Sequence, residues 1–172
     1  MEEPKLVVRE GLELPLREFF RQCCEPQVVL IRAFAAEIGY QRTLGLIKEV
    51  RREAVLQAGL RLQESLVRED SRSDFELFVA TLERVLRSDL HRLALEVEEL
   101  ERTDNRLRLK VTRCLWAEIY RELEAEEIGY AYICEPNRAL PEAFSAKIRL
   151  ERTKTLMLGD EYCDHCYIFE ER

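Results

Sequence analysis

One four-residue run near the end of the chain, Cys163-Asp164-His165-Cys166, places a carboxylate and an imidazole between two thiols. The chain contains only two histidines, so half of its imidazole groups lie in this run. A thiol beside an imidazole can act as a nucleophile with its base, and the same side chains are common metal ligands. A catalytic or metal-binding site is therefore expected here first.

The expected backbone divides this run between two faces. Residues Cys163 to about Phe169 are predicted to form the last strand, and side chains two apart in a strand share a face. Cys163 and His165 then point one way, whereas Asp164 and Cys166 point the other. The two sulfurs of the C-x-x-C spacing should diverge, which argues against redox chemistry of the thioredoxin type.

Cys163 with His165 suits a thiolate nucleophile that a neighbouring imidazole activates. A buried cysteine beside a hydrogen-bonded histidine would show the same spacing, because unpaired cysteines are often inert core residues. Zinc is a further alternative if separate strands converge, although no paired C-x-x-C…C-x-x-C knuckle occurs. The ligands of such a zinc ion would be Cys134, Cys163, His165 and Cys166.

The composition of the chain excludes several classes of function. A net charge of -7 opposes broad contact with nucleic acid, and no apolar run approaches the ~18 residues of a membrane span. The first residues lack the basic start and apolar stretch of a signal peptide, so we expect a cytoplasmic protein with reduced thiols. Its six cysteines are then not a disulfide framework. The expected partner is a small molecule, and a homodimer is possible.

The first half of the chain is predicted to be helical. Pro15 is placed like a first helical residue, and Pro26 is expected to open a second helix. This second helix is apolar on almost all sides from 28 to 38 and should therefore be buried. A longer amphipathic helix is expected from about Arg42 to Val67.

The spacing of apolar residues stays helical through one more helix and then changes to the alternation of a strand. Ser73 and Glu76 form a capping box that begins a helix with a strong apolar stripe. Alternating apolar residues at 93–97 and 107–111 then predict a β-hairpin. A helix is expected from Leu115 to Glu127.

Three more strands are expected after that helix. They are a short strand at 129–134, a long one at 146–157, and the last strand that begins at Cys163. The predicted fold is α+β, with N-terminal helices packed on an antiparallel sheet of about five strands. We expect a single domain, with a helical part at about 12–90 and a β-rich part at about 91–172.

The segment from about Cys114 to Phe169 resembles the L-2-amino-thiazoline-4-carboxylic acid hydrolase family. The spacing of Arg-Thr, Thr-Leu, Gly-Asp and Cys-Asp pairs is the specific part of the pattern. Its pieces are Cys114 ahead of a helix, Glu127-Ile-Gly-Tyr130 leading to Cys134, Lys147-Ile-Arg-Leu-Glu-Arg-Thr-Lys-Thr-Leu156, Gly159-Asp160 and Cys163-Asp164-His165. The chain departs from the pattern at Cys166, where an arginine or a similar residue is expected.

This resemblance implies hydrolytic opening of a small cyclic amidine, a thiazoline with a carboxylate, at a C–N bond. Cys163 would be the nucleophile or a ligand, His165 the base, and Arg152 would hold the substrate carboxylate through its bidentate fork. The expected catalytic residues are Cys163, His165, Asp164 and Cys134. The expected substrate-binding residues are Arg152, Cys114 and Asp160.

A second hypothesis is a non-catalytic module that binds a small molecule, with or without a structural zinc. Its apolar ligand would lie among aromatic side chains, which would be Trp116, Tyr120, Tyr130 and Phe169. Zinc content and the reactivity of the Cys163 thiol would separate the two hypotheses.

Overall fold

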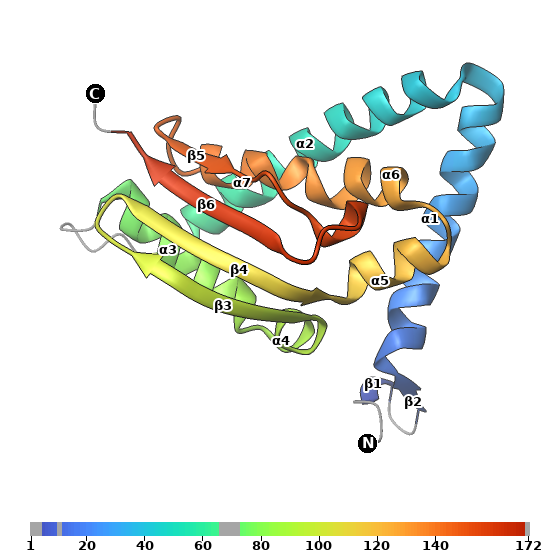
Figure 1. Ribbon diagram of the computed structural model, residues 1–172, viewed down its shortest axis with the longest axis horizontal. Coiled ribbons are helices and arrows are strands. Elements are labelled where there is room, and N and C mark those ends of the chain that lie inside the picture. The colour runs from blue at the N-terminus through green and yellow to red at the C-terminus, as the bar shows by residue number, and fades with distance from the viewer. Residues whose placement is uncertain (1–4, 10–11, 66–72, 171–172) are drawn as a thin grey trace.

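The computed structural model describes residues 5–9, 12–65 and 73–170, and it has the predicted α+β architecture. Two long helices, α1 (Leu16–Ile38) and α2 (Tyr40–Glu64), meet at a sharp bend and flank a sheet with its short helices (Figure 1). Gly39 forms the bend with a φ of 91°, in the left-handed region that glycine adopts without strain. A short hairpin of β1 (Lys5–Arg9) and β2 (Leu12–Pro15) precedes α1.

The helix α1 passes through Pro26, so the prediction that Pro26 opens a second helix is wrong. Proline inside a helix removes one N–H and displaces a carbonyl of the preceding turn. Pro26 lies on the exposed side of α1, where water can satisfy that carbonyl. The helix therefore continues from Leu16 to Ile38.

The expected burial of residues 28–38 is also wrong in part. Val28 and Ile31 are buried against the rest of the protein, but Val29, Leu30 and Phe34 are exposed. A helix without a second covering layer can bury only one side, because its side chains point around the full circle of the axis.

The capping box is confirmed. The Ser73 hydroxyl accepts from the Glu76 N–H at 3.2 Å, and the Glu76 carboxylate accepts from the Ser73 N–H at 2.7 Å. Helix α3 (Asp74–Leu86) then packs its apolar stripe on the sheet, with Phe78 completely buried. The helix expected from Arg42 to Val67 corresponds to α2, and Val67 lies outside the described residues.

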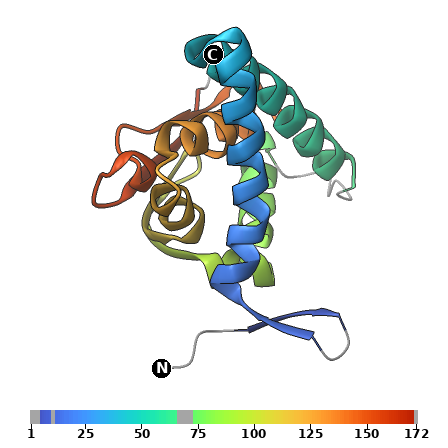
Figure 2. The ribbon, with the colours of Figure 1, turned by 90° about the vertical axis from the view of Figure 1, so that its right-hand side faces the viewer.

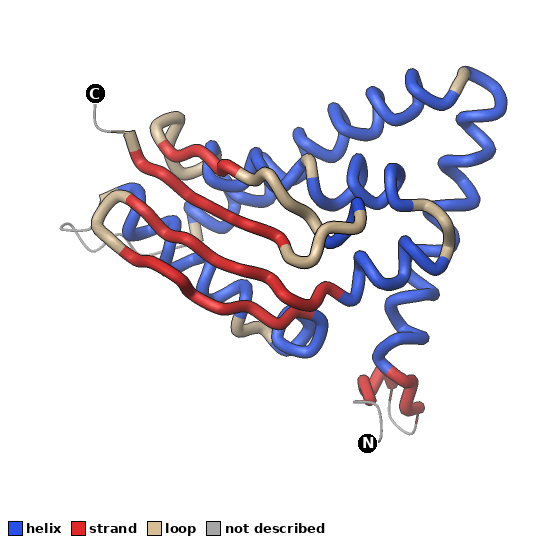
Figure 3. Tube along the Cα trace, viewed as in Figure 1, coloured by secondary structure: helices blue, strands red, loops and turns tan. Residues whose placement is uncertain are grey.

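The main sheet has four antiparallel strands in the described ranges, in the order β3-β4-β6-β5 (Figure 3). The strands are β3 (Leu95–Arg102), β4 (Arg106–Cys114), β5 (Ile148–Glu151) and β6 (Cys163–Phe169). The predicted hairpin of β3 and β4 is confirmed. In β4 the apolar residues Leu107, Leu109 and Val111 are buried on the side of α3, while polar residues alternate on the other side.

The strand expected at 129–134 is helical, so the main sheet has one strand fewer than predicted. Helix α6 (Glu126–Gly129) continues into η1 (Tyr130–Cys134), a π-helical turn in which the Glu135 N–H donates to the Tyr130 carbonyl. Ile128, Ala131 and Cys134 are buried at intervals of three, which is a helical period. This burial outweighs the strand-like alternation of the two tyrosines.

The long strand expected at 146–157 is also shorter, because β5 ends at Glu151. After it, the backbone N–H groups of Thr153 and Lys154 donate to the Asp164 carboxylate, and that of Thr155 donates to Asp160. These carboxylates accept the hydrogen bonds that a neighbouring strand would otherwise accept, so the segment does not continue as a strand. It turns instead through η3 (Leu156–Leu158).

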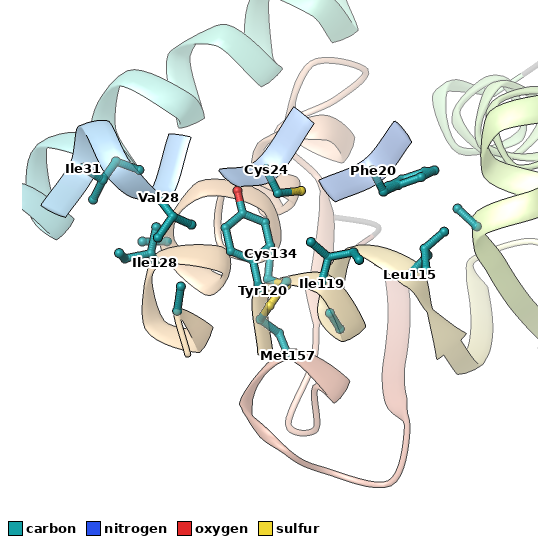
Figure 4. Close-up of a cluster of buried hydrophobic side chains, with 14 of the residues drawn as sticks. Phe20, Cys24, Val28, Ile31, Leu115, Ile119, Tyr120, Ile128, Cys134 and Met157 are labelled. Atoms are coloured by element: carbon teal, nitrogen blue, oxygen red, sulfur yellow. The ribbon is translucent and has the colours of Figure 1, made fainter. Parts of the chain in front are cut away.

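Short helices complete the side of the sheet that faces α1 and α2, as the view in Figure 2 shows. They are α4 (Asp89–Ala94), α5 (Leu115–Glu122), η2 (Pro136–Arg138) and α7 (Ala139–Glu142). The core between α1, α5 and α6 includes Phe20, Tyr120 and Ile128, and Cys134 and Met157 lie in the same cluster (Figure 4). None of the helices in the described ranges is long and apolar enough to cross a membrane.

Candidate functional site

Three buried thiols from three separate elements lie close together. Cys114 ends β4, Cys134 ends η1 and Cys163 begins β6. The Thr155 hydroxyl oxygen is 3.9 Å from the Cys134 sulfur and 3.8 Å from the Cys163 sulfur. Cys114 interacts electrostatically with both other thiols. The structure therefore assembles a thiol cluster, defined here as Cys114, Cys134 and Cys163, around Thr155.

Hydrogen bonds set the orientation of Cys163 within the cluster. Its thiol donates to the Thr155 hydroxyl, which in turn donates to the Cys134 sulfur. The Leu156 N–H donates to the Cys163 sulfur at 3.3 Å. No hydrogen bond joins Cys163 to His165 among the described residues, and Cys163 is only 7% exposed.

Burial keeps the other two thiols of the cluster neutral. It raises the pKa of Cys134 to about 11, although the nearby Arg152 guanidinium and the Thr155 hydroxyl act in the opposite direction. Burial likewise raises the pKa of Cys114 to about 12, against the effect of the Ala117 N–H at the start of α5. Since the thiolate is the nucleophilic form, neither group is an activated nucleophile at neutral pH.

Arg152 and His165 form the polar part of the site. The Nη2 atom of Arg152 and the Nε2 atom of His165 are both buried, and neither has a hydrogen-bond partner among the described residues. The Arg152 guanidinium lies 5.5 Å from the centre of the Tyr130 ring and interacts electrostatically with Cys134 and His165. Buried polar atoms normally have partners, so Arg152 Nη2 is placed to donate to an acceptor group of a ligand, and His165 Nε2 is placed to meet a second polar group of that ligand or a water molecule.

The imidazole of His165 is neutral in this environment. Burial lowers its pKa to about 4, and the positive charges of Arg152 and Arg138 add to the effect, while Asp164 opposes it. A neutral imidazole can accept a proton, which is the first requirement for a general base near pH 7.

The ring under Arg152 is held by a small polar frame. The Tyr130 hydroxyl donates to the Glu135 carboxylate at 2.7 Å, and Arg138 pairs with the same carboxylate at 3.4 Å. Arg138 also donates to the Leu150 carbonyl at 2.9 Å, which ties the frame to β5. The π-helical turn thus presents Tyr130 to Arg152 and Cys134 to the thiol cluster.

The two aspartates of the motif position the loop rather than face the thiols. Asp164 accepts from the Thr153 hydroxyl and from two backbone N–H groups. Partial burial acts to raise the pKa of Asp164, but these hydrogen bonds outweigh it and lower the pKa below its usual value. Asp160 accepts from the Thr155 N–H at 2.7 Å. Together they fix the turn that carries Thr155.

Cys166 does not join the thiol cluster. It lines a groove of about 510 Å³ on the outer face of the sheet, together with Asp164, Tyr162, His165 and Lys110. The four ligands expected for zinc are therefore not assembled. In residues 5–9, 12–65 and 73–170 no group of three or more cysteine, histidine or acidic side chains is close enough to hold a metal ion.

The aromatic residues expected to line one ligand space are divided between two cores. Trp116 and Tyr120 pack in the core of α1 and α5, where Tyr130 lies at the edge. Phe169 packs with Phe75 in the core under α3. The predicted single aromatic pocket is therefore wrong.

Sequence reasoning missed Thr155 and Arg138. Thr155 is the N-cap of η3, and its hydroxyl accepts from the Met157 N–H at 3.3 Å. A threonine two residues before that N–H, followed by Gly159, is a local signal of a capped turn. Arg138 had no comparable signal, because its partners lie on β5 and are brought to it only by the tertiary fold.

Comparison with known proteins gives a family match and matches to solved structures, two of which are described below. The family model described as L-2-amino-thiazoline-4-carboxylic acid hydrolase matches residues 16–167. No protein with a curated function matches the sequence.

The phenol-responsive sensory domain of the transcription activator PoxR, solved with phenol, is 14% identical with a TM-score of 0.51, and the match covers 95% of this chain and 83% of that one. A trafficking protein particle complex subunit 3 from Naegleria fowleri, covalently bound to palmitic acid, is 12% identical with a TM-score of 0.43. That match covers 84% of this chain and 95% of that one. The likeness to the PoxR domain shows a shared fold.

Proposed function

Because the chain belongs to the L-2-amino-thiazoline-4-carboxylic acid hydrolase family, we propose that it hydrolyses a small cyclic amidine that carries a carboxylate. One observation supports this function above the others. Within the described part of the chain, the buried Arg152 Nη2 and His165 Nε2 atoms both lack a hydrogen-bond partner, and Arg152 lies beside the neutral Cys134 thiol and the Tyr130 ring. The carboxylate of a small anionic substrate would satisfy Arg152 Nη2, and the attacking water molecule would satisfy His165 Nε2.

Arg152 is the carboxylate anchor in this proposal. Its guanidinium carries a positive charge and a planar fork of N–H donors that matches the two oxygens of a carboxylate. The Tyr130 ring supports one face of the guanidinium, so its plane is oriented before the substrate arrives. A buried charge of this kind binds an anion more strongly than a surface arginine would, because less water competes.

His165 is the general base. It takes a proton from a water molecule while the water oxygen forms a bond to the amidine carbon of the ring. The bond from that carbon to the ring nitrogen then breaks. The nitrogen leaves as a primary amine with one proton from the imidazole and a second from the hydroxyl group of the tetrahedral intermediate, which becomes the carbonyl of the product. One water molecule is consumed, and the product is an open-chain carbamoyl compound that retains the carboxylate.

Substrate binding itself would strengthen this base. The positive charge of Arg152 contributes to the low pKa of His165. A carboxylate on Arg152 offsets that charge, so the imidazole pKa rises toward the working pH once the substrate is bound. The general base is thus strongest in the complex that needs it.

Water, rather than Cys163, is the nucleophile in this proposal. Cys163 bonds to Thr155 and Leu156 instead of His165, and it is almost fully buried. Cys114 and Cys134, whose pKa values are raised by burial, then form an uncharged wall of the site.

The test is turnover of synthetic 2-amino-2-thiazoline-4-carboxylate by the purified chain, measured by mass spectrometry as the gain of one water. Arg152→Gln is expected to lower kcat/KM by about 10- to 100-fold, the range for losing a charged hydrogen bond. With 2-amino-2-thiazoline, which lacks the carboxylate, the same variant should differ little from wild type. His165→Gln should lower kcat on both compounds.

A Cys163→Ala variant serves as the control for the choice of nucleophile. It should retain turnover if water attacks and lose it if the thiol attacks. Absence of ring opening by the wild-type protein, with and without added zinc, would refute the hydrolase proposal. An equal effect of Arg152→Gln on both compounds would refute the anchor.

A binding module without turnover is the second candidate, and the raised pKa values of Cys114 and Cys134 favour it. Neutral buried thiols suit a binding wall as well as a reaction site. Calorimetric binding of the carboxylated thiazoline without any product would support this candidate. Turnover of the same compound would exclude it.

A further inference from the structure

Helices α1 and α2 carry a continuous apolar surface that none of the described elements covers. We define it as the α1–α2 patch, made of Val29, Leu30, Phe34, Ile38, Leu46 and Val50. Their exposed fractions are 63%, 57%, 53%, 41%, 47% and 68%, respectively. The view of Figure 2 shows α1 in front of the rest of the molecule, with no element over it. Single exposed apolar residues are ordinary, but six neighbours on one surface are not.

Helical spacing makes the α1 part of this patch continuous. Pro26, Leu30, Phe34 and Ile38 are four residues apart and therefore lie one above the other along the helix. They span about 18 Å at 1.5 Å per residue. Charged Arg32 is drawn away from the stripe, because its guanidinium donates to backbone carbonyls after α5.

Two depressions alternate with a ridge on this surface. One depression lies on the N-terminal half of α1, between Gln22 and Ala33. The other is a groove of about 590 Å³ between α1 and α2, whose floor includes Ala54 and Tyr132. Arg51 fixes Tyr132 there, since its Nε donates to the Tyr132 carbonyl at 3.1 Å and its guanidinium lies 4.3 Å from the ring centre. Leu30 lines the first depression and Phe34 lines the groove, so these two neighbouring side chains form the ridge where the two depressions meet.

We propose that the α1–α2 patch is the two-fold interface of a homodimer, in which the Leu30 and Phe34 ridge of each copy enters the groove of the other. A two-fold contact uses the same surface on both partners, so a patch with both a ridge and a groove is self-complementary. Antiparallel pairing also brings Glu25, near the start of one patch, toward Arg42 at the far end of its partner. Neither residue has an ion pair among the described residues, and both are exposed.

The exposed area agrees with a protein partner. Each half-exposed side chain of this size leaves on the order of 100 Å² accessible, so the six leave about 600 Å², the upper limit for the largest patch of a typical monomer. With its polar rim the patch reaches the roughly 800 Å² per partner of a standard stable interface. A small apolar ligand would fill only the groove and would leave Val29 and Leu30 in water.

The test is the molar mass of the intact chain, measured by light scattering after size exclusion and by sedimentation velocity from about 1 to 100 μM. Wild type should have twice the 20.4 kDa of the monomer. Leu30→Glu and Phe34→Glu should each weaken association at least about 100-fold, because every dimer would then bury two unpaired carboxylates. Both residues are exposed in one copy, so circular dichroism should show unchanged folding.

Leu100→Glu is the matched control, since Leu100 is 49% exposed and lies on β3, away from the patch. A wild-type dimer that this control preserves and the two patch variants dissociate supports the proposal. A monomer at every concentration overturns it, and so does a dimer that both patch variants preserve. A monomer that carries a fatty acid or another apolar molecule in native mass spectrometry also overturns it in favour of a ligand in the groove.

Discussion

Removing the imidazole of His165 should make the free energy of unfolding less dependent on pH between pH 7 and pH 5. Burial, assisted by Arg152, lowers the pKa of His165 from 6.5 to about 4 in the folded protein. The unfolded chain therefore binds more protons than the folded one between these two values, so stability rises with pH across this window. It is fully present above pH 6.5 and is lost as the pH falls toward 4.

The size of this effect follows from the shift. At 1.36 kcal/mol per pH unit, a change of about 2.5 units corresponds to roughly 3 kcal/mol below pH 4, of which about 2 kcal/mol is already lost at pH 5. His165→Gln removes the titrating group and keeps a neutral polar side chain. The free energy of unfolding of this variant should therefore fall less than that of wild type between pH 7 and pH 5.

Urea denaturation of both proteins at pH 7, 6 and 5 measures this difference. Carboxylates that titrate in the same window are present in both proteins and cancel in the comparison. His91→Gln is the control, because it removes the other histidine and leaves the contribution of His165 in place. Parallel pH profiles for wild type and His165→Gln would refute the claim that this imidazole is buried in neutral form.

The same reasoning gives a spectroscopic test of the contact with Arg152. Arg152→Gln removes a positive charge that lowers the pKa of His165, so NMR titration should show this pKa rising toward 6.5. With only two histidines the signals are readily assigned. An unchanged pKa would show that the two side chains do not share the proposed site.

Two further predictions concern the core that supports the site. Gly129→Ala should destabilise the fold by about 3 kcal/mol, because its Cβ would lie 2.5 Å from the Met157 sulfur. Gly45→Ala has open space around the new methyl group and should instead stabilise α2 by up to about 1 kcal/mol. Thermal melts of both variants check this pair. In the native protein, iodoacetamide at pH 7.5 should modify exposed Cys23 long before Cys134, because burial keeps the Cys134 thiol protonated. Peptide mass spectrometry measures the order of modification, and a faster reaction at Cys134 would contradict this prediction.

Local signals in the sequence were sufficient for the parts of the fold that depend on local physics. The capping box at Ser73, the apolar stripe of α3 and the alternation of β4 each follow from a short-range period, and all are present in the structure. The same alternation separates Cys163 from Cys166 across the sheet, and Cys166 indeed lines the outer groove. The motif spacing from Cys114 onward also indicated the family whose model matches residues 16–167.

Tertiary contacts decided the secondary structure of two segments whose short-range residue patterns had predicted strands. Tyr130 and Tyr132 alternate as in a strand, yet the segment is a π-helical turn because Ala131 and Cys134 complete a buried helical face. The extended segment after β5 becomes a turn because Asp160 and Asp164 take up its N–H groups. Such partners are distant in the chain or compete with a ladder, so no short-range pattern reveals them.

The sequence by itself determined which residues have the chemistry for a site: the thiols, the imidazole of His165 and the charge of Arg152. Only the tertiary structure decided how they are grouped. It placed Cys163 with Thr155 instead of His165, and it buried His165 beside Arg152. The physical reason is that residue type sets what a group can do, whereas burial and neighbouring charge, which only the folded chain supplies, set its protonation state and its partners.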